Sequence, residues 1–215
     1  PEATSYWRSE PLPFKPRSLY TMRYRAKRLG EGGGPPVIGP VFSNYILYST
    51  DLGHWTDNTM VFQTPDDLTP ERAWLRLGQA RMSPESTVAF DEVRIFPVQP
   101  VYARHGDIEL GNGERIEGNR FYSSPMWSLL RSNQYRELYG FKNTVYNHNA
   151  FLMGDGSEVL FRYQVGSRKQ LSASLSVKPM YYFNGALVWE TSSDGKTWQE
   201  LYRFTEDKGA ALDLP

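Results

Sequence analysis

Alternation between apolar and polar residues constrains the fold of this chain more than any other feature. Within residues 18–28, SLYTMRYRAKR, the stretch 20–27 alternates between the two kinds of side chain. The apolar set is Tyr20, Met22, Tyr24 and Ala26, and the polar set is Thr21, Arg23, Arg25 and Lys27. Because successive side chains of a β-strand point to opposite faces, this pattern predicts a strand with one buried and one solvated face.

Further strand-like segments follow along the chain, and none shows a convincing helical period. The segments 44–50, 59–65, 72–80 and 86–98 are short, apolar and bounded by turn residues. The 18 glycines and 15 prolines supply many breaks between them. Only 65–72, PDDLTPER, has room for a helical turn. The sequence therefore predicts an all-β fold with two antiparallel β-sandwich domains of the jelly-roll kind.

A domain boundary is predicted near residues 98–106. Pro97 and Pro100 interrupt the last strand of the first half, because proline has no amide hydrogen for a sheet ladder. We expect the first domain, residues 1–100, to be a jelly roll that lacks its first strand. We expect the second, residues 104–215, to be a β-sandwich module that is truncated at its C-terminus.

Composition argues against several classes of partner. The chain has 24 basic and 24 acidic residues, so no net charge attracts nucleic acid or an anionic membrane. No apolar run approaches the roughly 20 residues of a membrane span. The sequence has no cysteine, which excludes disulfides and thiolate metal sites.

Two glycine-containing segments predict turns. Residues 192–198, SSDGKTW, are similar to the Asp-box of sialidase propellers, S-x-D-x-G-x-T-W, but Asp194 and Gly195 are adjacent here. An adjacent Asp-Gly pair predicts a tight hairpin turn instead, because glycine adopts positive φ angles without strain. Gly154-Asp155-Gly156 predicts a second hairpin turn for the same reason.

Sequence motifs for catalysis are absent. The three histidines, His54, His105 and His148, are widely spaced and form no H-E-x-x-H motif. Neither a G-x-S-x-G elbow nor a phosphate-binding P-loop occurs. Carboxylates such as Asp107 and Glu109 could form a glycosidase pair, but β-proteins offer such pairs by chance. We therefore expect no catalytic residues in this chain.

The first half resembles the jelly-roll carbohydrate-binding modules of the cellulose- and xylan-binding type. In residues 6–28, YWRSEPLPFKPRSLYTMRYRAKR is similar to their Trp-Ser pair, "P-V-x-P" segment and "Y-x-L-S-F-Y-A-R" strand. Residues 62–98 resemble their closing pattern, "F-T-x-P … A-x-L-x-L … F-D-D-V-x-L". The resemblance covers about residues 5–98, without the first strand "N-x-G-F-E" of the family.

That resemblance implies a structural calcium ion. In the family the closing strand contributes an aspartate to the site, and Asp91 matches its position. The next acidic residue of the motif is Glu92 here. Alternatively, Asp91 only ends or kinks the strand, so calcium and no metal are equally expected.

Five residues are candidates for sugar binding. Sugar sites stack planar aromatic rings on the sugar and surround them with hydrogen-bonding groups. Strand alternation in 72–80 places Trp74 and Arg76 opposite Leu75 and Leu77. If the neighbouring strand shares the sheet, Arg23 and Arg25 complete a platform that favours acidic or sulfated glycans. Trp55 is a further candidate. Alternatively, Trp74 packs under a loop and the arginines are merely solvated.

These observations predict a non-catalytic, carbohydrate-binding region of a larger secreted or cell-surface protein, whose partners are a polysaccharide and neighbouring domains. The second half is similar to β-sandwich modules appended to bacterial glycoside hydrolases. One alternative is a structural or adhesive pair of modules that positions neighbouring domains or subunits. Another is an accessory piece of a glycoside hydrolase whose catalytic site lies elsewhere.

Overall fold

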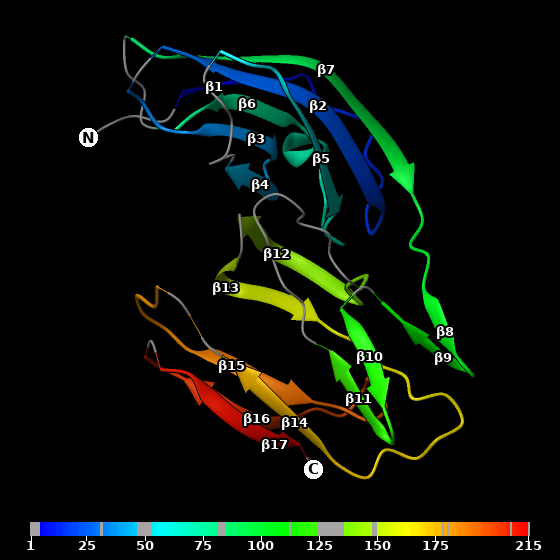
Figure 1. Ribbon diagram of the computed structural model, residues 1–215. Helices are drawn as coiled ribbons and strands as arrows, with labels where there is room; N and C mark the ends of the chain where they lie inside the picture. Colours follow the sequence, from blue (N-terminus) through cyan, green and yellow to red (C-terminus); the bar gives the residue numbers. More distant parts are fainter. Residues whose placement is uncertain are drawn as a thin grey trace. The chain divides into compact units, whose positions relative to one another are not determined.

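Strands dominate the computed structural model of the chain (Figure 1). The structure describes residues 5–30, 32–46, 53–80, 85–111, 113–123, 136–147, 150–177, 179, 181–206 and 208–214. Seventeen strands and one short 3-10 helix, η1 (Pro70–Arg72), are found there. The all-β fold is therefore confirmed, and η1 lies in the segment for which a helical turn was predicted. Among the described residues, no helix has the length and apolar character to cross a bilayer.

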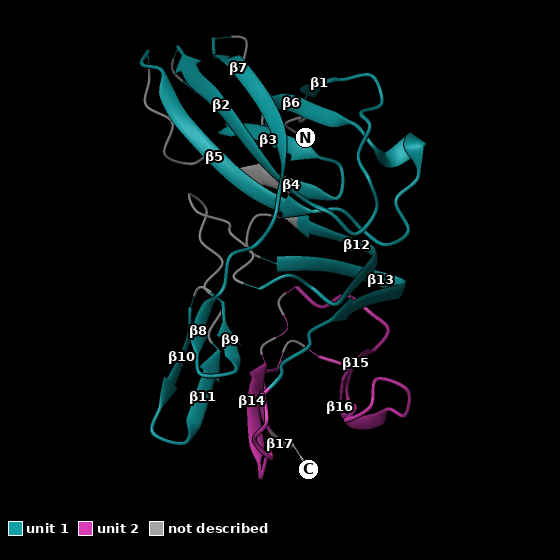
Figure 2. Cartoon of the chain, turned by 90° about the vertical axis from the view of Figure 1, so that its right-hand side faces the viewer, with its two compact units in different colours: residues 1–164 teal, residues 165–215 magenta. Residues whose placement is uncertain are grey.

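Two sheets form the larger of two compact units, residues 1–164 (Figure 2). The first sheet has six strands in the order β1 (Ser5–Arg8), β6 (Leu75–Gln79), β3 (Pro36–Pro40), β4 (Ser43–Ile46), β12 (Gly140–Asn147) and β13 (Ala150–Leu160). The second has three antiparallel strands in the order β5 (Thr56–Gln63), β2 (Leu19–Leu29) and β7 (Thr87–Val98). All pairs in the six-stranded sheet are antiparallel except β4 with β12, which run parallel at Ser43 and Tyr146.

The two sheets enclose one hydrophobic core. The predicted inward set of β2, from Tyr20 to Ala26, is buried in it. The other members are Ile38, Phe42, Met60, Phe62, Leu75, Leu138, Phe141 and Tyr146. Alternation in β2 thus reports burial correctly, because each apolar side chain faces the opposite sheet.

A buried glutamine connects the two sheets. Gln63, at the end of β5, is fully buried. Its side-chain amide donates to the Leu138 carbonyl at 3.0 Å, and its carbonyl accepts from the Leu138 amide at 2.8 Å. Both polar groups of a buried side chain and both backbone groups of Leu138 are satisfied by this one contact.

The larger unit also contains two hairpins. They pair β8 (Ala103–His105) with β9 (Ile108–Leu110), and β10 (Glu114–Glu117) with β11 (Arg120–Ser123). The Glu114 side chain is almost fully buried, and its carboxylate accepts hydrogen bonds from the Arg136 guanidinium at 2.5 and 2.7 Å. Arg136 also lies over the rings of Tyr102 and Tyr163. This ion pair joins the hairpin region to the segment that enters β12.

The division between units differs from the predicted boundary near residues 98–106. The compact units meet at Gln164 and Val165. Residues 138–146 belong to the first unit because β12 pairs with β4 and because Leu138 and Phe141 complete its core. Strand β12 and the segment before it therefore complete this core from beyond residues 5–98.

The second unit, residues 165–215, contains two antiparallel strand pairs. They are β14 (Ala173–Val177) with β17 (Ala210–Leu214), and β15 (Leu187–Thr191) with β16 (Gln199–Phe204). The module expected over 104–215 thus corresponds to a much shorter unit of its own.

The two predicted hairpin turns have different outcomes. Residues 192–198 do connect β15 to β16, and Gly195 has a φ of 70°. Gly154-Asp155-Gly156, however, lies inside β13. The pairing of β12 with β13 shifts register between Lys142 and Thr144, and the Asn143 side chain donates to the Asp155 carbonyl at 2.7 Å. The glycines therefore form an irregularity within a paired strand and do not reverse the chain.

Candidate functional site

The polar side chains of β2 lie on the outer face of the three-stranded sheet. Arg23 is exposed there, and Arg25 and Lys27 are half-buried. In the sheet register, Arg25 lies opposite Asp57 of β5 and Asp91 of β7. Directly opposite residues share one face of a sheet, so pairing alone places Arg25 between two carboxylates.

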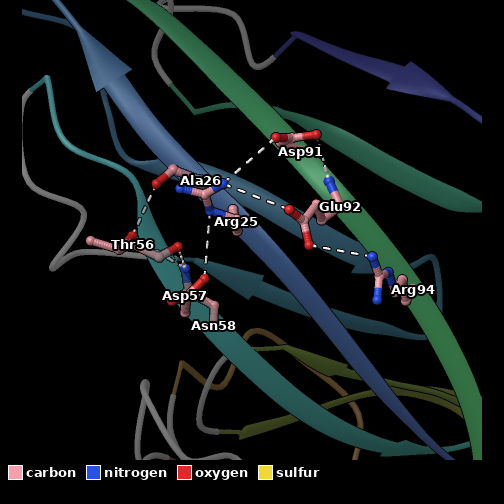
Figure 3. A network of polar contacts seen from close by, with 8 residues as sticks. All are labelled: Arg25, Ala26, Thr56, Asp57, Asn58, Asp91, Glu92 and Arg94. Atoms are coloured by element: carbon pink, nitrogen blue, oxygen red, sulfur yellow. Dashed lines mark hydrogen bonds and ion pairs between the residues drawn. The ribbon is translucent and has the colours of Figure 1, made fainter.

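A bulge in β7 adds a third carboxylate. The register of β2 and β7 shifts between Arg23 and Arg25, and Glu92 has a φ of 52°. In a regular strand Asp91 and Glu92 would point to opposite faces. The extra residue turns the strand locally, so both carboxylates reach Arg25 (Figure 3).

Arg25 is therefore the centre of an exposed polar network. Its guanidinium lies 3.6 Å from Asp57, 3.7 Å from Glu92 and 4.0 Å from Asp91. Arg94 extends the network by a contact of 3.5 Å to Glu92. The Arg25 side chain is 36% exposed and the four partners more so. Such ion pairs contribute only about 0–1 kcal/mol each, so a polar ligand can replace them at little cost.

Trp55 lies at one end of this network, immediately before β5. Its indole is half-buried, with the Lys27 ammonium 4.5 Å and the Arg25 guanidinium 5.3 Å from the ring centre. Cation–π contacts of this kind hold an aromatic ring at a defined position without enclosing it. We call this surface the Trp55 face and define it by Arg23, Arg25, Lys27, Trp55, Asp57, Asp91, Glu92 and Arg94.

The structure brings together four of the six predicted site residues. Arg23, Arg25, Trp55 and Asp91 all lie on the Trp55 face. Asp57 and Arg94 were not predicted as parts of the site, because nothing local in the sequence shows which strands pair with β2. Lys27 has the same parity as Arg23 and Arg25, so the alternation already placed it on their face.

Trp74 and Arg76 belong to a different sheet. Arg76 lies on β6 and Trp74 immediately before it, whereas Arg23 and Arg25 lie on β2 of the three-stranded sheet. The condition for the predicted common platform is therefore not met. Trp74 is only 8% exposed. This agrees with the alternative that Trp74 is a packed side chain and not an exposed sugar-binding one.

Strand β1 covers Trp74. The Tyr6 ring stacks on Trp74 at 6.1 Å between centroids, and the Arg8 guanidinium lies 4.3 Å from the ring centre. The indole N–H donates to the Glu71 carbonyl at 2.9 Å. This tryptophan is thus enclosed and hydrogen-bonded, which identifies it as a packing residue of β1 and β6.

The surroundings of Asp91 do not fit a calcium site. Calcium takes six to eight oxygen ligands, whereas the Asp91 carboxylate accepts a hydrogen bond from the Glu92 amide at 2.8 Å and lies beside the Arg25 cation. Within the described ranges, no group of three His, Cys, Asp or Glu side chains is arranged to hold a metal. Calcium binding by this chain remains a prediction.

The loop at 192–198 is held by the Asp194 carboxylate. Its Oδ1 accepts hydrogen bonds from the amides of Lys196 at 2.7 Å and Thr197 at 2.8 Å, and from the Ser192 hydroxyl at 3.0 Å. These backbone donors lower the pKa of Asp194 to about 2. The aspartate therefore has a complete structural role within its own turn.

Comparisons of the chain with protein-family models, with curated proteins and with solved structures found no match.

Proposed function

We propose that this chain is a non-catalytic carbohydrate-binding region of a larger secreted or cell-surface protein, and that it binds glycan on the Trp55 face. Binding would combine stacking of a sugar ring on Trp55 with hydrogen bonds from the arginine and carboxylate side chains beside it. No covalent step is involved.

The half-exposed position of Trp55 carries this proposal. Lys27 and Arg25 hold the indole at the edge of an open, polar sheet face. A planar apolar ring beside densely placed donors and acceptors suits a sugar, which has apolar C–H faces and a rim of hydroxyls.

The charge of the Trp55 face favours a neutral glycan. The face carries the cations of Arg23, Arg25, Lys27 and Arg94 and the carboxylates of Asp57, Asp91 and Glu92. The carboxylates around Arg25 offset most of the positive charge that suggested acidic or sulfated glycans. Sugar hydroxyls can donate to the carboxylates and accept from the guanidinium groups.

Glycan-array screening followed by calorimetry tests the proposal. Trp55→Ala should weaken binding by roughly five- to thirtyfold, which corresponds to about 1–2 kcal/mol of stacking. Trp55→Phe keeps an apolar ring and should retain most of the affinity. Trp7→Ala is the matched control, because Trp7 is 60% exposed and lies on β1 of the other sheet.

Equal losses in Trp55→Ala and Trp7→Ala, with both variants folded by circular dichroism, would remove the Trp55 face as the binding site. Absence of binding to any glycan on the array would refute the proposed function itself.

A structural or adhesive role is the second candidate, and one observation favours it. In the second unit, Tyr181 is 78% and Phe183 is 91% exposed in the segment before β15. Exposed aromatic residues two positions apart, as here, are typical of contact surfaces. A Tyr181→Ser/Phe183→Ser variant that keeps glycan binding but loses association with neighbouring domains of the parent protein would favour this role.

A further inference from the structure

Two arginines lie side by side on the outer face of the six-stranded sheet. Arg8 of β1 is the direct partner of Arg76 of β6 in the antiparallel register. Leu75 and Leu77, on either side of Arg76 in the strand, pack against the core. Alternation therefore places Arg76 on the opposite, outer face, and the paired position places Arg8 there too.

Neither arginine has a carboxylate partner among the residues that the structure describes. Among the described residues, the Arg76 side chain makes one hydrogen bond, a long one from Nη2 to the Val41 carbonyl at 3.4 Å. Its Nε is buried and finds no acceptor in the same part of the chain. Burial lowers the pKa of Arg76, because desolvation disfavours the cation. Two like charges directly opposite each other in a sheet are also unfavourable.

Gly39 and Trp74 are neighbours of this pair. On the other side of Arg76, the register partner is Gly39 of β3, and the Ser43 carbonyl oxygen lies 2.2 Å from the place that its Cβ would take. Arg8 is fixed against the ring of Trp74, and Tyr6 stacks on the same ring. Arg8 is thus held in place by an aromatic contact, and Arg76 by its contact with the Val41 carbonyl.

We infer that Arg8 and Arg76 form a binding site for an oxyanion, that is, a carboxylate, sulfate or phosphate group of a ligand. An oxyanion would accept hydrogen bonds from the terminal guanidinium nitrogens and would offset the repulsion between the two cations. Guanidinium groups bind such planar or tetrahedral anions through paired N–H donors. The site lies on a different sheet from the Trp55 face, so it does not depend on the proposed function.

The test is a titration of the whole chain with sodium sulfate, sodium phosphate, sodium acetate and sodium glucuronate at constant ionic strength. Nitrogen-15 NMR of the arginine Nε–H groups is the readout, with sodium chloride as the reference salt. We expect a saturable shift of the Arg76 signal. Tighter binding of glucuronate than acetate would identify a sugar acid as the source, whereas preference for sulfate or phosphate would identify an ester group.

Variants separate this site from general salt effects. Arg8→Gln should weaken the saturable shift about tenfold or more, since one charge-assisted donor set is lost. Arg94→Gln, which removes an exposed arginine from the other sheet, and Trp55→Ala should both leave it unchanged. Arg76→Met should abolish the saturable shift of the Arg8 Nε–H signal, and if that variant does not fold, Arg8→Gln alone decides. Equal affinity in Arg8→Gln and the parent chain, or no saturable shift with any of the four salts, overturns the inference.

Discussion

Gln63 offers the most direct test of the fold, because one side chain connects β5 to the segment that enters β12. Gln63→Leu removes both partners of the Leu138 backbone, whose N–H and C=O are bonded at 2.8 and 3.0 Å. Leu138 is only 2% exposed, so water cannot replace the lost bonds without opening the core. Each unsatisfied buried group costs about 1–3 kcal/mol, or about 2–6 kcal/mol for the two. Because leucine buries more apolar surface and leaves no amide to desolvate, we expect a net loss of about 2–4 kcal/mol.

Urea denaturation followed by circular dichroism measures this loss, and hydrogen exchange at the Leu138 amide locates it. Thr59→Val is the matched control, because Thr59 lies on the same strand with its side chain exposed. It should change the free energy of unfolding by about 0.5 kcal/mol or less. A loss below about 1 kcal/mol for Gln63→Leu, with unchanged exchange at Leu138, would show that the two sheets are not joined through this contact.

Three further predictions concern other parts of the chain. The Asp194 carboxyl should titrate near pH 2 by carbon-13 NMR. Its pKa is depressed from 3.8 on folding, so the turn is stabilised above about pH 4 and loses that stabilisation as the pH falls toward 2; a midpoint near 4 would contradict this. Glu114→Gln should lower the free energy of unfolding by about 3 kcal/mol, because Arg136 is left mostly buried without its carboxylate; a urea midpoint equal to that of the parent chain would contradict it. Gly78→Ala should detach β1, since the added Cβ would lie 2.1 Å from the Ser5 carbonyl oxygen; unchanged protection of β1 amides in hydrogen exchange would disprove this.

Local sequence patterns predicted the strands better than they predicted the site. In β2, the alternation from Tyr20 to Ala26 gave the buried face correctly because every second side chain meets the same core. The alternation rule holds only within a strand, and Trp74 lies outside one. The residue precedes β6, and β1 covers it through Tyr6 and Arg8. Nothing near Trp74 in the sequence shows that a segment about 70 residues earlier lies on it.

The domain boundary and the Trp55 face also depend on contacts between segments that lie far apart in the sequence. Strand β7 includes Pro97 and ends at Val98, two residues before Pro100, but the chain then returns to supply Leu138 and Phe141 to the core already begun. Likewise, Arg23 and Arg25 were recognised from parity, whereas the carboxylates around Arg25 depend on the pairing of β2 with β5 and β7. The bulge at Glu92 adds a further shift that alternation does not predict.

The parallel pairing of β4 with β12 has a consequence for how the chain folds during synthesis. Ser43 and Tyr146 are more than a hundred positions apart, so the core cannot close when the first seven strands leave the ribosome. At about 5–20 residues per second, the missing strand follows several seconds later. During that interval the core lacks Phe141 and Tyr146, which β12 supplies. We therefore expect the nascent chain to expose apolar surface that favours aggregation until β12 has been synthesised.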